Sequence, residues 1–180
     1  MRPARRRESV AERRQRLGAV DDPQVVLDAA ARFLEARQRS VTEVRRRLRG
    51  AGYRPELVDG AIERLLELGI LDDEAFARAW VESRDRARPR GERAIREELR
   101  VKGIDRATID AVLEERRGGD DDKPDRDAAE RLIERNARSL ARVAEPRKRR
   151  ERAYALLARN GFDPEVCREV AAKVGALETR

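Results

Sequence analysis

Apolar residues recur along this chain at the spacing of helices that each bury one face. After Pro23, the residues Val26 and Ala30 fall on one side of such a helix. Comparable stripes continue almost to the end of the chain, where Val170 and Val174 have the same spacing. The pattern therefore predicts an all-α protein.

Capping and turn residues divide the first part of the chain into three helices. Asp22 and Pro23 predict the start of the first, because an aspartate can cap free amides and a proline fits the first turn. The segment Ser40-Val-Thr-Glu43 matches a capping box, which predicts a second helix. Gly52 is expected to end this helix in the left-handed conformation. The third helix has a broad inward-facing stripe, which consists of Leu57, Val58, Ala61, Ile62, Leu65 and Leu66.

The sequence around Gly52 occurs twice more. Leu48-Arg-Gly-Ala-Gly-Tyr-Arg54 corresponds to Leu99-Arg-Val-Lys-Gly-Ile-Asp105 and to Leu157-Ala-Arg-Asn-Gly-Phe-Asp163, with the glycines 51 and 58 residues apart. These offsets align Cys167 with two aliphatic residues, Val58 and Ile109. We therefore expect Cys167 to belong to the core rather than to act as a reactive thiol.

The repeat predicts three tandem three-helix units, at residues 23–71, 72–117 and 127–180, in an elongated and curved all-α array. Residues 118–126 contain consecutive glycines and three aspartates, which predict an acidic flexible linker and make the third unit the most mobile. Residues 1–22 are rich in arginine and are expected to be a disordered arm, either a phosphate-binding tail or an extension that only aids solubility.

Two aromatic residues, Phe76 and Trp80, lie in the predicted first helix of the second unit. They share a helical face with Ala77 and Val81, which favours packing in the core. Stacking against nucleic-acid bases is the alternative interpretation.

Charge changes this picture more than any other bulk property. Of the 180 residues, 44% are charged and only 3% are aromatic, and the net charge is +7 with a pI of about 10.4. Such a balance suits a polyanion or an acidic protein surface as partner. The alternative is that the arginines pair with the abundant glutamates at helical spacing and remain solvated.

Candidate catalytic chemistry is sparse. The chain has one cysteine and no histidine, and it contains no phosphate-binding glycine-rich loop. The aspartates at 120–122 lack the ligand alternation of an EF-hand, so we predict a spacer, no metal site, no cofactor and no enzyme activity. No apolar run approaches the roughly 18 residues of a membrane span, and the Arg-rich start lacks the apolar segment of a secretory signal. We expect a cytoplasmic protein.

One long segment carries a family resemblance. GILDDEAFARAWVESR (69–84), followed by RPRGERAIREELRVKGID (88–105), resembles the signature of the RecX family, regulators of the RecA recombinase. Residues 40–77 are similar to the first repeat of that family, and residues 149–170 are similar to the third. The resemblance implies a protein that binds the RecA–DNA filament along its groove and inhibits the recombinase, ATPase and co-protease activities of RecA. We expect a monomer that also contacts single- and double-stranded DNA without sequence preference.

The second helix of every unit is basic, which favours a functional surface over a merely solvated one. The candidate contact residues are Arg45, Arg46 and Arg49 in the first unit, Arg84, Arg86, Arg88, Arg90, Arg93, Arg96, Arg100 and Lys102 in the second, and Arg147, Lys148, Arg149 and Arg150 in the third. Two other hypotheses stay open: a general DNA- or RNA-binding protein that needs no RecA, and a structural helical adaptor.

Overall fold

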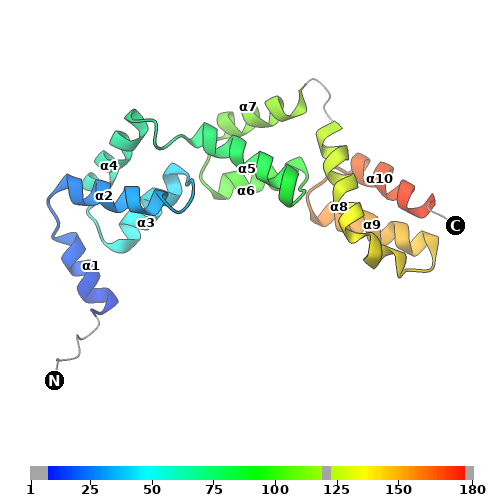
Figure 1. Ribbon diagram of the computed structural model, residues 1–180, viewed down its shortest axis with the longest axis horizontal. Helices are drawn as coiled ribbons and strands as arrows, with labels where there is room; N and C mark the ends of the chain where they lie inside the picture. Colours follow the sequence, from blue (N-terminus) through cyan, green and yellow to red (C-terminus); the bar gives the residue numbers. More distant parts are fainter. Residues whose placement is uncertain (1–7, 119–122, 177–180) are drawn as a thin grey trace. The chain divides into compact units, whose positions relative to one another are not determined.

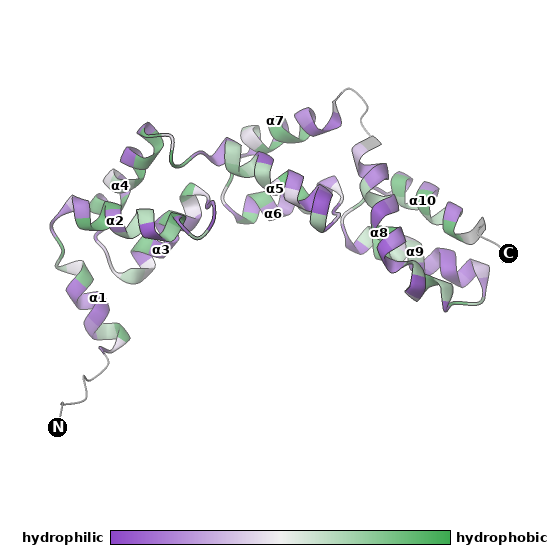
Figure 2. Cartoon of the chain, viewed as in Figure 1, coloured by the Kyte–Doolittle hydropathy of each residue, from purple (hydrophilic) through white to green (hydrophobic). Residues whose placement is uncertain are grey.

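Helices account for all regular secondary structure in residues 8–118 and 123–176, the part of the chain that this computed structural model describes (Figure 1). This confirms the all-α prediction. The helices are α1 (Val10–Gly18), α2 (Pro23–Leu34), α3 (Val41–Ala51), α4 (Pro55–Glu67), α5 (Asp73–Ala87), α6 (Glu92–Val101), α7 (Arg106–Arg117), α8 (Lys123–Ala141), α9 (Pro146–Arg159) and α10 (Pro164–Ala176). Hydrophilic and hydrophobic residues alternate along their turns, as amphipathic helices require (Figure 2).

The same helix ending closes α3, α6 and α9. The glycine after each helix has a positive φ, 111° at Gly52 and 82° at both Gly103 and Gly161. The amide of the following residue donates to the carbonyl five residues earlier, in the pairs Tyr53 to Leu48, Ile104 to Leu99, and Phe162 to Leu157, at 3.3, 3.1 and 3.4 Å. This is the Schellman arrangement, which glycine favours because it has no Cβ. The structure thus confirms that the repeated sequence encodes a repeated turn.

The chain divides into two compact units, residues 1–76 and 77–180, which we describe separately. In the first unit, α2, α3 and α4 surround an aliphatic core that includes Val26, Val44, Leu48 and Leu65. The predicted stripe on α4 is correct except at Leu66, which is 45% exposed because the three-helix core is too narrow to cover both Leu65 and Leu66.

The first unit also contains α1, which the sequence did not predict. A capping box starts it: the Ser9 hydroxyl accepts from the Glu12 amide at 3.2 Å, and the Glu12 carboxylate accepts from the Ser9 amide at 2.8 Å. Leu17 is buried at the end of α1. The prediction of a disordered arm is therefore wrong for residues 10–18. Residues 1–7 lie outside the described part of the chain.

The second unit contains residues 77–117 of the second predicted repeat and the whole third predicted repeat. Helices α8, α9 and α10 enclose a core around Leu157, Phe162 and Val166. Helix α8 begins at Lys123, so residues 123–126 are helical and the predicted linker is too long at its end. Residues 119–122, which include the three aspartates, lie outside the described residues.

The two repeats of the second unit pack closely at the start of α6. The Gly91 amide donates to the Asn160 carbonyl at 3.0 Å. An added Cβ at Gly91 would lie 2.3 Å from the Gly161 carbonyl oxygen and 2.4 Å from the Phe162 Cα. The backbone before α6 therefore touches the turn between α9 and α10, and only glycine fits at this position.

Candidate nucleic-acid and partner interface

The second helices α3, α6 and α9 present most of the predicted contact residues, and the structure divides all of them except Lys102, which contacts Trp80, into three groups. The first group consists of cations paired with a carboxylate three or four residues away in the sequence. Their ion pairs, at 2.7 to 3.2 Å, are Arg86 with Glu82, Arg100 with Glu97, Arg147 with Glu151, and Lys148 with Glu145. Exposed pairs of this kind contribute little stability, so their arginines can exchange a glutamate for another anion at small cost.

The second group connects a helix or its flanking residues to a different helix or turn. Its contacts join Arg45 and Arg49 to Asp59, Arg84 to Glu98, Arg90 to Asn160, Arg93 to Asp163, Arg96 to Asp110, and Arg149 to the carbonyls of Val143 and Ala144. Arg90 and Arg93 belong to the contact between α6 and the α9–α10 turn. Changes at these two residues would therefore perturb packing as well as any binding surface.

The third group is exposed and has no ion pair within the described residues. It contains one arginine from each repeat: Arg46, Arg88 and Arg150. These three side chains are the predicted contact residues whose charge no neighbouring carboxylate offsets, so they are the clearest candidates for an external anion.

Trp80 is half-buried rather than enclosed in the core. Its indole nitrogen donates to Glu98 at 2.8 Å. The guanidinium of Arg84 lies 4.2 Å from the ring centroid, and the Nζ atom of Lys102 lies 4.8 Å from it. Such cation–π contacts order the two cations around a half-buried ring. The core prediction is correct for Phe76, which is 4% exposed, and wrong for Trp80.

A buried charge network lies at the junction of the second and third repeats. Arg116 binds Asp85 at 2.8 Å and Asp125 at 2.6 Å, and Asp125 also accepts from the Glu92 amide at 3.0 Å. Burial opposes the charge of Arg116, but the two carboxylates outweigh it and raise the pKa of Arg116. Burial raises the pKa of Asp125, although the Glu92 amide and Arg116 work against that rise. The network fixes the start of α8 beside the start of α6.

Sequence reasoning missed this network because Asp125 fell inside the predicted linker. It also missed Arg13 and Arg14 of α1, although Ser9-Val-Ala-Glu12 is a capping signal of the same type as Ser40-Val-Thr-Glu43. That signal could have located α1.

Two observations on the described residues concern candidate nucleophiles and metal ligands. Cys167 is buried, and burial raises the pKa of its thiol, in agreement with the predicted core role. In that part of the chain, no group of three or more Cys, Asp or Glu residues could hold a metal ion. No described helix is long and apolar enough to cross a membrane.

Models of the RecX family match the chain in three places. The first three-helix domain matches residues 27–65, the second matches 72–113, and the third matches 124–171. The second match begins at Asp72, where the second repeat was predicted to start. The third begins inside the predicted linker, in agreement with the position of α8.

Whole-chain comparisons give the same assignment. A protein of Mycobacterium avium (strain 104) named "Regulatory protein RecX" is 33% identical over 150 residues, which cover 83% of this chain and 84% of that protein. A protein of the same name from Mycobacterium sp. (strain JLS) is 36% identical over 142 residues, or 77% of this chain and 75% of the relative. The crystal structure of RecX from Lactobacillus salivarius has the same fold, with a TM-score of 0.73 at 21% identity over 87% of this chain and 99% of that one. The chain is a member of the RecX family.

Proposed function

We propose that this protein binds the RecA–DNA filament along its groove and inhibits the recombinase, ATPase and co-protease activities of RecA. The observation that carries the proposal is similarity over most of the chain to proteins named as RecX regulators. It acts by binding, as a cytoplasmic monomer without a cofactor, and it serves DNA recombination and repair.

The charge pattern supports the proposal independently of the family. A filament of RecA on DNA offers both protein surfaces and phosphates, and each repeat carries a basic second helix. Exposed arginines suit phosphates because the guanidinium fork can donate two parallel hydrogen bonds. The three arginines without ion pairs, Arg46, Arg88 and Arg150, are the proposed points of contact.

Single-strand-dependent ATP hydrolysis by RecA provides the test. The protein is titrated below the RecA concentration, with DNA in excess so that simple sequestration of DNA cannot lower the rate. We expect suppression of hydrolysis, and weaker suppression by the variant R46Q/R88Q/R150Q. Unchanged hydrolysis at every concentration of the protein would contradict inhibition of the ATPase.

A matched control variant distinguishes the loss of three contact residues from the loss of net positive charge. R64Q/R106Q/R138Q also removes three positive charges, but from exposed positions on α4, α7 and α8, outside the second helices. We expect this control to suppress hydrolysis as well as the unchanged protein does. Equal weakening of both variants would show that net charge, not the positions of Arg46, Arg88 and Arg150, determines the effect.

General nucleic-acid binding without RecA is the second candidate function. The cluster of Trp80, Arg84 and Lys102 favours it, since an aromatic ring flanked by cations is common where proteins bind single strands. Under this alternative, Trp80 fluorescence changes equally with bare oligonucleotide and with the RecA filament.

A further inference from the structure

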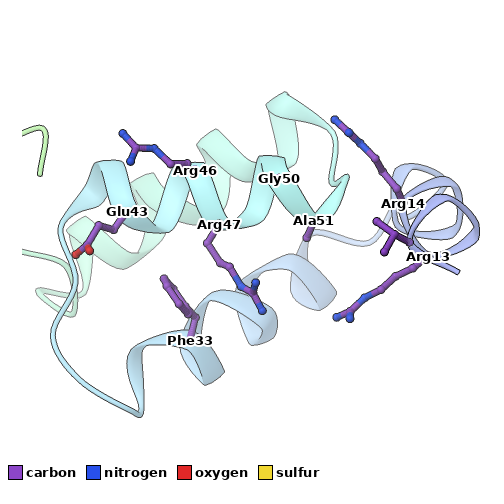
Figure 3. Close-up of a pocket in the computed structure, with 9 residues that line it drawn as sticks. Arg13, Arg14, Phe33, Glu43, Arg46, Arg47, Gly50 and Ala51 are labelled. Atoms are coloured by element: carbon purple, nitrogen blue, oxygen red, sulfur yellow. The ribbon is translucent and has the colours of Figure 1, made fainter. Parts of the chain in front are cut away.

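A basic groove lies in the first unit, between α1 and α3 with α2 at its base (Figure 3). Its volume is about 570 Å³, within the range of about 300 to 1,000 Å³ typical of ligand sites. The polar and aromatic side chains that line it are Arg13 and Arg14 from α1, Phe33 from α2, and Glu43, Arg46 and Arg47 from α3. In Figure 3, Arg13 and Arg14 extend from α1 toward the side on which α2 and α3 lie, and Arg47 extends from α3 toward α2, beside Phe33.

The groove has an excess of positive charge that the protein itself does not offset. It contains four guanidinium groups and one carboxylate, that of Glu43. This carboxylate is already engaged, because it accepts from the Ser40 amide and from Arg37, both at 3.3 Å. None of the four arginines forms an ion pair with another described residue. Most of the predicted contact residues in α6, by contrast, are paired.

Close packing holds the two basic helices together despite their like charge. Gly52 ends α3 so close to α1 that an added Cβ would lie 2.6 Å from the Arg14 side chain and 2.8 Å from the Arg14 carbonyl oxygen. Leu17 is buried beside this contact. Phe33 also helps to place one guanidinium, since that of Arg47 lies 5.6 Å from the ring centroid. The contact between Gly52 and Arg14 therefore keeps the arginines of α1 beside those of α3 before any partner binds.

We propose that the α1–α3 groove binds the sugar-phosphate backbone of a nucleic acid. A phosphodiester chain supplies singly charged groups at regular intervals, so that one ligand can satisfy several guanidinium groups at once. The apolar part of the lining, from Val10, Phe33 and Ala51, can pack against the sugars between the phosphates. An acidic peptide is the alternative occupant that the test below excludes. Because no base-reading element lies here, binding is independent of sequence.

This site goes beyond the proposed function in two respects. Helix α1 lies outside the residues that the family models match, which begin at 27. The site also needs no RecA, so its test and the ATPase test can fail separately.

The test is the salt dependence of oligonucleotide binding by the full-length protein, measured by fluorescence anisotropy with a labelled oligothymidine and with a duplex of the same length. Each phosphate contact contributes about 0.7 to the slope of log K against log salt for single strands and about 0.9 for duplexes. The variant R13Q/R14Q should therefore lose about 1.4 from the slope with oligothymidine, or about 1.8 with the duplex. If the affinities of the variant and the unchanged protein become equal at 1 M salt, a slope loss of about 1.4 corresponds to about 25-fold weaker single-strand binding by the variant at 0.1 M salt. The strand form that the unchanged protein binds more tightly at 0.1 M salt is the preferred ligand.

The matched control is R16Q/R64Q. Arg16 lies on the same helix, but it binds Glu8 at 2.8 Å and does not line the groove, and Arg64 binds Glu67 on α4 at 2.8 Å. This control loses two positive charges, as R13Q/R14Q does, and should keep the salt slope of the unchanged protein. The proposal would be overturned if R13Q/R14Q had the same salt slope as the unchanged protein, or if the control lost as much slope as R13Q/R14Q. It would also be overturned if the protein bound neither nucleic acid, or if polyglutamate competed as effectively as oligothymidine.

Discussion

Replacing Gly91 with alanine should destabilise the second unit strongly for so small a change. The added Cβ would lie 2.3 Å from the Gly161 carbonyl oxygen and 2.4 Å from two further backbone atoms, the Gly161 carbonyl carbon and the Phe162 Cα. Ordinary contacts begin at 3.4 Å, so the backbone before α6 and the α9–α10 turn must separate by about 1 Å. Backbone atoms cannot rotate out of the way as a flexible side chain can.

The expected cost has two parts. Overpacking of a close contact costs about 1 to 3 kcal/mol. Separation also weakens the hydrogen bond of 3.0 Å from the Gly91 amide to Asn160, which is worth about 1 kcal/mol. Together they predict a loss of about 2 to 4 kcal/mol in the free energy of unfolding.

Urea unfolding followed by tryptophan fluorescence measures this loss, because Trp80 is the only tryptophan and lies in the second unit. The control is Gly60→Ala in α4, where an added Cβ meets nothing within 4 Å. This control, followed by circular dichroism, should be stabilised by about 0.5 to 1 kcal/mol through helix propensity. An unchanged unfolding midpoint for Gly91→Ala would refute the close contact between the second and third repeats.

Three further perturbations test the local signals on which the repeats depend. Gly103→Val should cost at least about 1 to 2 kcal/mol, since a β-branched residue resists the left-handed conformation, and undiminished thermal stability would mean that α6 does not end at this glycine. Ser40→Ala should lower the free energy of unfolding by about 1 kcal/mol, because the cap of α3 is lost. Ser40→Thr should keep most of that stability, and an equal loss in both variants would argue against the cap. Hydrogen bonds from the Thr108 side chain and amide lower the pKa of Asp105 below its ordinary value of 3.8 in the folded protein. The stability that this carboxylate contributes is present above pH 3.8 and is lost as the pH falls through the lowered pKa, so the advantage of the unchanged protein over Asp105→Ala should shrink on acidification. Unfolding curves at several pH values measure that difference, and an advantage that stays constant down to pH 2 would contradict the assigned cap.

Local signals were sufficient to predict most of the fold. The turn at each repeat depends on one glycine and its neighbours, and the capping box of α3 depends on Ser40 and Glu43 alone. Both operate within a few residues and can therefore be recognised in the sequence. Helix α1 escaped because it buries only Leu17 and so lacks a hydrophobic stripe.

The candidate site was less predictable because its contacts join distant residues. The environment of Trp80 depends on Glu98 and Lys102, which reach it only when α6 packs beside α5. The role of Asp125 depends on Arg116 and on the Glu92 amide, 33 residues away. Charge patterning identified the basic helices, but it could not separate arginines that hold helices together from arginines that remain available to a ligand.

The central claim is that the protein recognises RecA assembled on DNA, not DNA alone. The most direct measurement compares its affinity, at one salt concentration, for RecA filaments on a labelled single strand, for the same strand without RecA, and for RecA without DNA. Our account predicts the tightest binding to the filament. Equal affinity for the filament and for bare DNA would contradict it and would favour a general nucleic-acid-binding protein.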